Sequence, residues 1–155
     1  MATTAQQSLN QLVQSFTLIG NAHQQIKTFG FGQIYHIATS GTINYPVMWA
    51  ELDHVEDESH TTNYFVNFYV MDVVQNDRSN ETNALSDCIL IATDIIAELK
   101  HPDWTFDVVV NESVKIDYYT EGMTDKVAGV KWNMMIKIET PDDTCAIPQG
   151  AIARF

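Results

Sequence analysis

The sequence predicts an α+β fold: a mostly antiparallel sheet with two helices on one face, followed by an extended C-terminal tail. Two segments, within 9–19 and 85–99, carry apolar residues at the three- and four-residue spacing of an amphipathic helix. The segments between and after them alternate apolar and polar residues, or run apolar without a break, as strands do. The resulting order is α-β-β-β-α-β-β, which favours a sheet covered by both helices on one side.

The chain is long enough for one domain with a substantial core. Its 155 residues are 45% hydrophobic and 18% charged, which is a globular rather than a disordered composition. We expect a single domain over 1–140 and a tail over 141–155. There is no apolar run of about 18 residues and no basic-then-apolar leader, so we expect no membrane contact and no secretion signal. Cys88 and Cys145 lie far apart, which favours free thiols in a reducing compartment.

The first third of the chain predicts a covering helix and then an extended segment. The helix is closed by Gly20 and Asn21, and the segment 24–38 is interrupted by Gly30 and Gly32. Glycines inside such a segment usually mark a bulge or a close approach of another group to the backbone. The apolar face of the helix consists of Leu9, Leu12, Val13, Phe16 and Ile19.

A long hairpin is predicted next. Its first strand covers 47–55, a polar tip covers 54–60, and the returning strand covers 62–74. The returning strand is apolar on both faces near Phe65 to Met71. Such a strand is either central in the sheet and buried from both sides, or packed against a neighbouring subunit.

The second helix begins after Ser79 or Asn80, either of which suits an N-terminal cap, and Pro102 stops it. The apolar stripe expected on this helix is broad, so we expect other parts of the protein to pack against the helix on more than one side. The stripe consists of Leu85, Cys88, Ile89, Ala92, Ile96 and Leu99, widened by Leu90, Ile91 and Ile95. We expect the helix to bury Leu85, Ile89, Ala92 and Ile96 against Phe106, Val108, Trp132 and Met134.

The last third predicts two strands and a tail. Apolar residues alternate from Trp104 to Ile116 and again from Ala128 to Ile138, with a glycine-containing loop at 118–125 between them. After Pro141 the sequence has no period, yet it contains Ile147, Ile152 and Phe155. We expect this tail to lie on a partner protein.

The charge is strongly negative and unevenly placed. The net charge is −12, and all 20 acidic residues lie between Glu51 and Asp143. We expect no specific nucleic-acid binding, because phosphate contacts need clustered Lys and Arg. In the first third of the chain, Lys27 is the only Lys, Arg, Asp or Glu before Glu51. This near absence of charge has two interpretations. The first third is an interface with other subunits, since charges are depleted from interface cores, or it is ordinary uncharged polar surface.

One cluster at the hairpin tip has ligand-type side chains. It consists of Glu51, Asp53, His54, Glu56, Asp57, Glu58 and His60. The carboxylate oxygens of this cluster would suit Ca²⁺ or Mg²⁺. However, the spacing from His54 to His60 is not that of a zinc-binding pair, and the segment does not have the EF-hand pattern. The favoured interpretation is a solvated projecting loop without a metal.

Other chemistry-bearing residues are scattered. His23, His36 and His101 have no visible acidic or nucleophilic partner, and Asp72 lies within a strand, where it would cap or pair. The glycines near residue 30 lack the Lys-Ser/Thr ending of a phosphate loop. We therefore predict no catalytic, cofactor-binding or metal-ligating residue, no cofactor, and no enzymatic activity.

The strand, elbow and helix from Asn63 to Lys100 resemble sequences in structural proteins of tailed phages. The aromatic-rich strand ends in Met-Asp-Val-Val, a polar elbow with Asn and Asp follows, and the helix ends in Leu-Lys. The segments 24–34, 45–52 and 127–138 also fit, so the likeness covers about 22–140. The chain resembles neck and ring proteins of Bacteroidota phages, including the crAss-like group, and more distantly tail-terminator and tail-completion proteins. It departs at the acidic tip and after Pro141.

The resemblance implies a function without catalysis. It implies a homo-oligomeric ring at the head–tail junction of a virion, through which DNA passes, in contact with neighbouring portal, neck and tail proteins. A negative lumen would let DNA pass without lasting contacts.

The alternative is a small-ligand-binding domain or a small enzyme with an aromatic-lined pocket. Its lining would consist of Trp49, Tyr64, Phe68, Trp104 and Trp132. At strand spacing, the same residues also fit an ordinary core.

Overall fold

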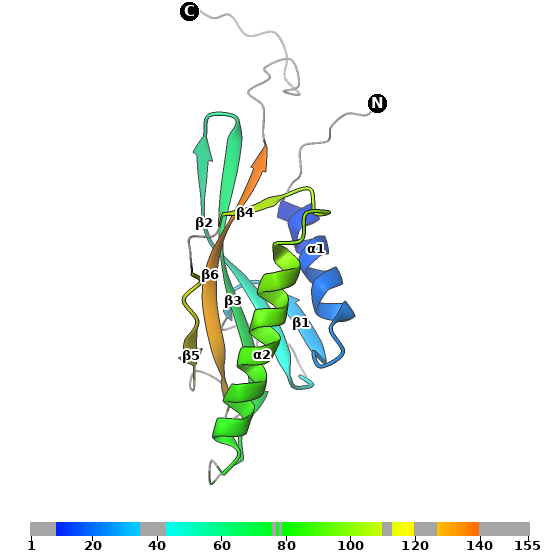
Figure 1. Ribbon diagram of the computed structural model, residues 1–155, viewed down its shortest axis with the longest axis vertical. Helices are drawn as coiled ribbons and strands as arrows, with labels where there is room; N and C mark the ends of the chain where they lie inside the picture. The colour runs from blue at the N-terminus through cyan, green and yellow to red at the C-terminus, as the bar shows by residue number, and fades with distance from the viewer. Residues whose placement is uncertain are drawn as a thin grey trace, which may run out of the picture.

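The order of helices and strands confirms the α+β fold (Figure 1). The computed structural model describes residues 9–34, 43–75, 77, 79–109, 113–119 and 127–139. Along the chain the elements are α1 (Leu9–Ala22), β1 (Thr28–Phe31), β2 (Val47–Glu58), β3 (Thr61–Val73), α2 (Glu81–Leu99), β4 (Asp107–Val109), β5 (Asp117–Tyr119) and β6 (Val127–Glu139). Neither helix in these described ranges is long and apolar enough to cross a membrane.

The sheet is mixed rather than mostly antiparallel. Its strand order is β1-β2-β3-β6-β4, and β5 pairs with a different part of β6. The β2–β3, β3–β6, β4–β6 and β5–β6 pairs are antiparallel, but β1 runs parallel to β2. Residues 32–46 join these two strands, which is long enough for the crossover that parallel neighbours need.

The β2–β3 hairpin is longer than the sequence predicted. Glu58 pairs with Thr61, so only Ser59 and His60 form the turn, and a register shift lies between Leu52 and His54. The expectation of a polar tip over 54–60 is therefore wrong for the acidic residues from Glu56 to Glu58, because they pair with β-forming residues of β3 in the ladder. The hairpin tip extends beyond the ends of both helices (Figure 1).

Among the described residues of the strand expected from Trp104 to Ile116, only β4 is a strand. A second short strand, β5, follows this range, and its last two residues were expected to begin the loop; both strands pair with the same edge of β6. Val108 of β4 pairs with Ile136, and Tyr118 of β5 pairs with Val130. The loop expected at 118–125 and the tail 141–155 lie mostly or wholly outside the described residues.

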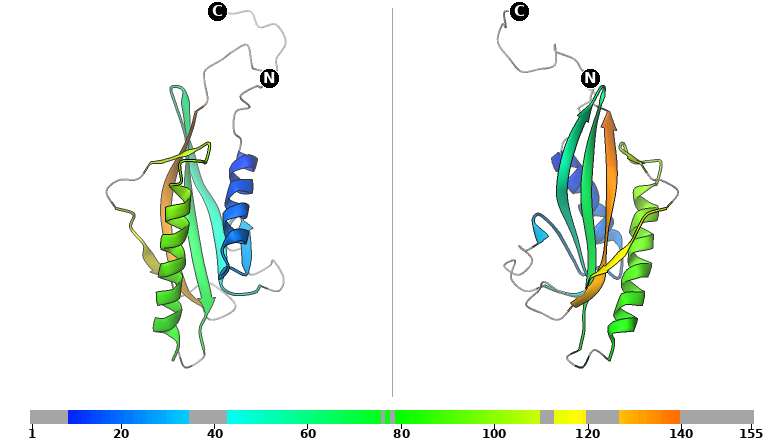
Figure 2. Two further views of the ribbon diagram at one scale, coloured as in Figure 1. Left: turned by 45° about the vertical axis from the view of Figure 1, so that its right-hand side comes forward. Right: turned by 90° about the vertical axis from the view of Figure 1, so that its left-hand side faces the viewer.

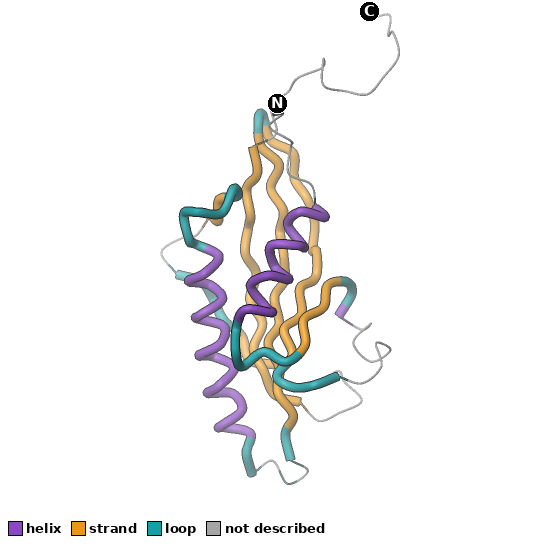
Figure 3. The backbone as a smooth tube through the Cα atoms, turned by 90° about the vertical axis from the view of Figure 1, so that its right-hand side faces the viewer, coloured by secondary structure: helices purple, strands orange, loops and turns teal. Residues whose placement is uncertain are grey.

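Both helices cover one face of the sheet, as predicted (Figures 2 and 3). Phe16 of α1 meets Phe68 of β3 edge-on with ring centroids 5.2 Å apart, and Phe68 stacks on Trp132 of β6 at 5.4 Å. These rings lie at the centre of the main core. The expected apolar face of α1 is largely buried, with Leu12, Phe16 and Ile19 in that core.

The buried face of α2 differs from the expected one. Ala92 and Ile96 are buried as expected, but Leu85 is only partly buried and Ile89 is 44% exposed. The expectation for Ile89 is wrong because the core-facing stripe is centred on the line through Cys88 and Ile95. The buried residues are Ala84, Cys88, Ile91, Ala92, Ile95, Ile96 and Leu99.

A second apolar cluster lies on the helix-free face. It contains Val47, Trp49, Tyr69, Met71 and Val127, with Ile34, Ile43 and Tyr45 packed against it. Thus β3 is buried from both sides in its second half, which was one of the two expected explanations for its apolar character.

Gly30 lies where another group approaches the backbone closely, as the sequence predicted. A Cβ atom there would lie 2.1 Å from the ring of Trp49. The indole Nε1 of Trp49 also donates a hydrogen bond to the carbonyl of Gly32 (3.0 Å). Gly32 itself has a φ of 141°, which favours glycine.

Candidate functional site

A groove with a volume of ≈ 500 Å³ lies between the two helices. Its walls come from the end of α1, the second half of α2 and the segment after α2. The lining is mainly apolar, with acidic groups from α2. The lining residues are Leu18, Ile19, Ala22, His23, Asp94, Ile95, Glu98 and Trp104.

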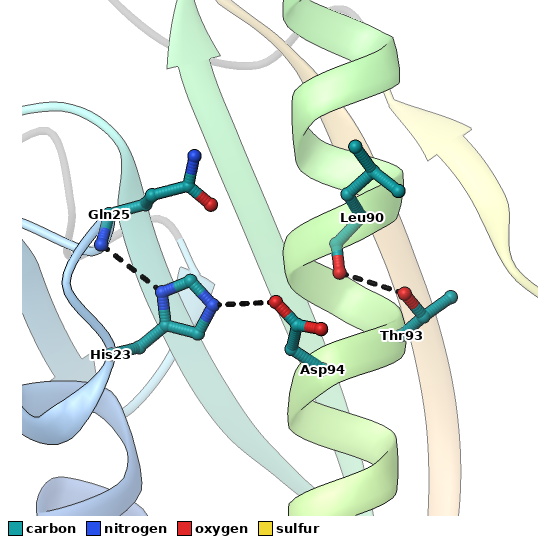
Figure 4. Close-up of polar contacts among 5 residues, drawn as sticks. All are labelled: His23, Gln25, Leu90, Thr93 and Asp94. Carbon is teal, nitrogen blue, oxygen red and sulfur yellow. Dashed lines mark hydrogen bonds and ion pairs between the residues drawn. The ribbon is translucent and has the colours of Figure 1, made fainter.

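His23 joins the end of α1 to α2 through a polar contact (Figure 4). Its Nε2 lies 2.9 Å from Oδ2 of Asp94, and its Nδ1 accepts the backbone N–H of Gln25 (3.2 Å). Because Nδ1 accepts, the neutral ring carries its proton on Nε2 and donates it to Asp94. Asp94 is largely exposed, so this contact fixes geometry more than it adds stability.

The contact of His23 corrects the sequence analysis, which found no partner for it. The two residues are 71 positions apart, so no local pattern could have revealed them. His101 has only a local role, since its Nδ1 accepts the backbone N–H of Asp103 (3.1 Å). His36 lies outside the described residues.

Trp104 is held in place at one end of the groove. Its Nε1 donates to the carbonyl of Glu98 (2.9 Å), and its ring stacks on Phe106 with centroids 5.6 Å apart. The contact lies at the end of α2, where backbone carbonyls lack partners within the helix. Trp104 is therefore a fixed apolar wall beside the acidic side chains of α2.

Two exposed leucines accompany the groove. Leu18, in its lining, is 62% exposed, and Leu90, one helical turn before Asp94, is 59% exposed. The hydroxyl of Thr93 donates a hydrogen bond to the carbonyl of Leu90 (2.8 Å; Figure 4), so this hydroxyl points toward the backbone of its own helix. This side of the two helices thus leaves apolar surface uncovered within the described part of the chain.

The five aromatic residues expected to line a pocket do not gather in one place. Of them, only Trp104 lines the groove. Phe68 and Trp132 stack in the main core, Tyr64 packs against that core, and Trp49 lies in the cluster on the opposite face.

The acidic half of β2 forms a projecting, exposed edge. Asp53, Glu56, Asp57 and Glu58 are all exposed. Because β1 pairs with β2 only from Val47 to Ala50, the outer edge beyond that point has no strand partner among the described residues.

Contacts within the hairpin are local. His54 stacks on Phe65 at 4.1 Å and lies 3.0 Å from Asp53, while Asn63 donates to Glu58 (2.9 Å). Within the described ranges, no three His, Cys, Asp or Glu side chains are grouped so that they could hold a metal ion. A metal-free tip remains a prediction.

Lysines lie toward the other end of the long axis, where β5 meets β6 (Figure 1). A shallow depression of ≈ 340 Å³ there is lined in part by Lys115, Asp117 and Lys131. Lys115 lies 3.5 Å from Asp117, and Lys131 is exposed. Asn133 donates to Asn67 (2.8 Å) beside them. This depression therefore differs in charge from the exposed carboxylates of β2.

Asp72 and Cys88 lie close enough to interact. Asp72 accepts the backbone N–H of Val73 (2.8 Å), so the carboxylate binds locally at the end of β3. Burial, together with the nearby carboxylates of Asp72 and Asp87, raises the pKa of the Cys88 thiol to about 12. Cys88 is thus a neutral core side chain rather than a nucleophile at neutral pH.

We expect native Cys88 to resist alkylation. The pKa lies about three units above its ordinary value of 9.0, which lowers the thiolate fraction about a thousandfold, and the side chain is fully buried. Iodoacetamide labelling followed by mass spectrometry, on a Cys145→Ser background, measures this. Labelling at the rate of a free thiol would contradict it. Because the unfolded thiol ionises first, the free energy of unfolding should fall from pH 9 to about pH 12.

We expect His60→Gly to stabilise the protein by about 0.5–1 kcal/mol. His60 has a φ of 68°, which costs a non-glycine residue about 1–2 kcal/mol, partly offset by the entropy of glycine. Urea unfolding measures the change, and His60→Ala, which keeps the strain, should leave stability within about 0.5 kcal/mol. A loss of stability on glycine substitution would show that the imidazole makes a contact that matters.

Neither the family models nor the curated proteins include a match to this chain. The structure itself defines the class of protein as an α+β domain with two helices on one face of a mixed sheet.

Proposed function

We propose that this protein is a structural subunit of a tailed-phage virion that forms a homo-oligomeric ring at the head–tail junction. The resemblance of Asn63 to Lys100 and its flanking segments to neck and ring proteins supports the class. On this proposal DNA passes through the ring, and the partners are neighbouring portal, neck and tail proteins. The subunit needs no catalytic residue, cofactor or metal for this role.

The observation that carries the proposal furthest is that two separate surfaces of the subunit differ in charge: the outer half of β2 carries exposed carboxylates, and the depression beside β5 carries lysines. Acidic side chains project at the hairpin tip, and Lys115 and Lys131 line the depression where β5 pairs with β6. A ring requires a heterologous contact, in which one surface of each subunit meets a different surface of the next. Two surfaces of opposite charge on one subunit suit such a contact, because complementary potentials guide the partners and fix their register.

The assembled mass and symmetry test the proposal. We expect native mass spectrometry and electron microscopy of the purified chain, alone and in infected-cell lysates, to give one closed ring of fixed copy number. A chain that stays monomeric at high concentration, and that is absent from purified particles, would overturn it.

Charge reversal should disrupt and then restore assembly. We expect Glu56→Lys with Asp57→Lys, or Lys115→Glu with Lys131→Glu, each to weaken association roughly tenfold, since like charges then face each other. The chain carrying all four changes should regain association. Lys100→Glu, an exposed change at the end of α2, is the control and should have no effect. Four-site variants that associate no better than the two-site ones would count against this contact.

The groove beside Trp104 favours a second candidate, a small-ligand-binding domain or a small enzyme. Its volume is in the range of small-molecule sites, and it combines apolar walls with Asp94 and Glu98. A small molecule that co-purifies with the chain, and is lost on Trp104→Ala, would support this candidate over the ring.

A further inference from the structure

We propose that the groove between α1 and α2 binds the C-terminal segment 147–155 of a neighbouring copy of this chain. That the segment comes from a neighbouring copy rests on the ring proposed above. The argument uses the apolar character of the groove, its charge, and the direction in which β6 runs.

The apolar side chains of the segment match the walls of the groove. The sequence 147–155 reads IPQGAIARF, in which Ile147, Ile152 and Phe155 are the large apolar residues. The groove offers Ile19, Ala22, Ile95 and Trp104, and Leu18 is 62% exposed beside them. Docking would remove apolar surface of both parts from water, which is the main driving force of association.

The charges also match. Arg154 is the only charged side chain in the segment, and the chain has only eight Lys and Arg residues in all. Asp94 and Glu98 lie one helical turn apart in the groove lining. Asp94 binds a neutral His23 through one carboxylate oxygen, so its negative charge remains for a cation. A guanidinium group suits such a position, because it can bind two carboxylate oxygens at once.

The direction of β6 favours a neighbouring copy over the same copy. β6 runs toward the hairpin tip and ends at Glu139 beyond the level of both helices (Figure 1). β6 therefore points away from the groove where it ends, so binding of the segment in the groove of the same copy would require a reversal of chain direction.

Binding of a synthetic peptide tests the groove itself. The receptor is the full chain with Ile152→Asp and Phe155→Asp, which keeps the groove and disables the segment; we name it the tail variant. We expect a fluorescein-labelled peptide 147–155 to bind it, and to bind at least tenfold more weakly after Leu18→Asp or Asp94→Lys. A peptide with Arg154→Glu should also bind at least tenfold more weakly.

Tyr118→Asp is the matched control. Tyr118 is 73% exposed on β5, so this change adds a charge to an exposed apolar position without touching the groove. It should leave peptide affinity unchanged. Circular dichroism checks that each variant is folded. The proposal would be overturned if the peptide bound equally well to folded receptors with and without Leu18→Asp. It would also be overturned if Tyr118→Asp weakened peptide binding as much as Leu18→Asp does.

Mixing two full-length variants tests the source of the segment. The tail variant has a groove without a segment, and the Leu18→Asp variant has a segment without a groove. We expect each alone to associate weakly and the mixture to form a one-to-one complex by size-exclusion chromatography. No association in the mixture, with both proteins folded, would overturn docking between copies.

The outcomes separate this inference from the ring. Rings that form equally well with Leu18→Asp would refute the docking and leave the ring intact. Peptide binding and pairwise complementation in a protein that never closes into a ring would support the docking and refute the ring.

Discussion

Replacing Ile91 with alanine is expected to lower the free energy of unfolding by about 2–5 kcal/mol. Ile91 is 1% exposed and lies in the main core, on the face of α2 that packs on β3 and β6. The loss combines the transfer of the deleted methyl and methylene groups with the cavity that remains, because close-packed neighbours relax only in part.

Ile89→Ala is the matched control for this prediction. It makes the same chemical change two residues earlier on the same helix, where the side chain is 44% exposed. It should cost under about 1 kcal/mol. Urea unfolding of both variants decides between the two faces of α2. A larger loss for Ile89 than for Ile91 would mean that the helix is rotated relative to the orientation described.

Replacing Gly129 with alanine is expected to cost about 3 kcal/mol or more. A Cβ atom at this position of β6 would lie 2.1 Å from the carbonyl oxygen of Val70 and 2.7 Å from Cα of Met71. Both atoms belong to the backbone of β3, the central strand, which is paired along its whole length with β6. Relief would require the two strands to separate, with loss of ladder hydrogen bonds.

Gly20→Ala provides the comparison. Its Cβ would lie 3.0 Å from the side chain of Phe29, a tight but adjustable contact, and alanine favours the helical backbone by about 1 kcal/mol. We expect a net change within about 1 kcal/mol by thermal or urea unfolding. A Gly129→Ala protein as stable as Gly20→Ala would mean that β3 and β6 are farther apart than described.

Periodicity sufficed to predict the kind and order of most elements, but not the rotation of α2. The run from Cys88 to Ile96 is apolar at seven of its nine positions, so several faces of the helix are apolar enough to be buried. Only the packing of the helix against β3 and β6 determines that the face through Cys88 and Ile95 is the buried one. Ile89, which the periodicity included among the buried residues, lies outside that face.

The hairpin and the first strand show two other limits of local reasoning. The acidic run to Glu58 was interpreted as a loop from its charge, whereas its partners in β3, from Thr61 to Phe65, hold it in a ladder. The parallel pairing of β1 depends on the path between Phe31 and Val47, which no local preference specifies.

The candidate site could not be predicted from the sequence for a related reason. His23 follows α1 and Asp94 lies in the middle of α2, and only the packing of the helices on one sheet brings them within 2.9 Å. The groove is formed by the packing of the two helices and does not correspond to any sequence motif. What the sequence did indicate correctly was local, as at Gly30, where the absence of a side chain makes room for Trp49.

The open outer edge of β2 has a consequence for how copies of the chain avoid sticking to one another. An unpaired strand edge is a template for uncontrolled sheet extension. Here two such edges meeting would bring the exposed carboxylates of Asp53, Glu56, Asp57 and Glu58 of one copy near those of another, and like charges repel. The repulsion is screened as salt rises. Ionic strength thus sets how well this strand is protected from fibre-like self-pairing, while leaving it accessible to a cationic surface.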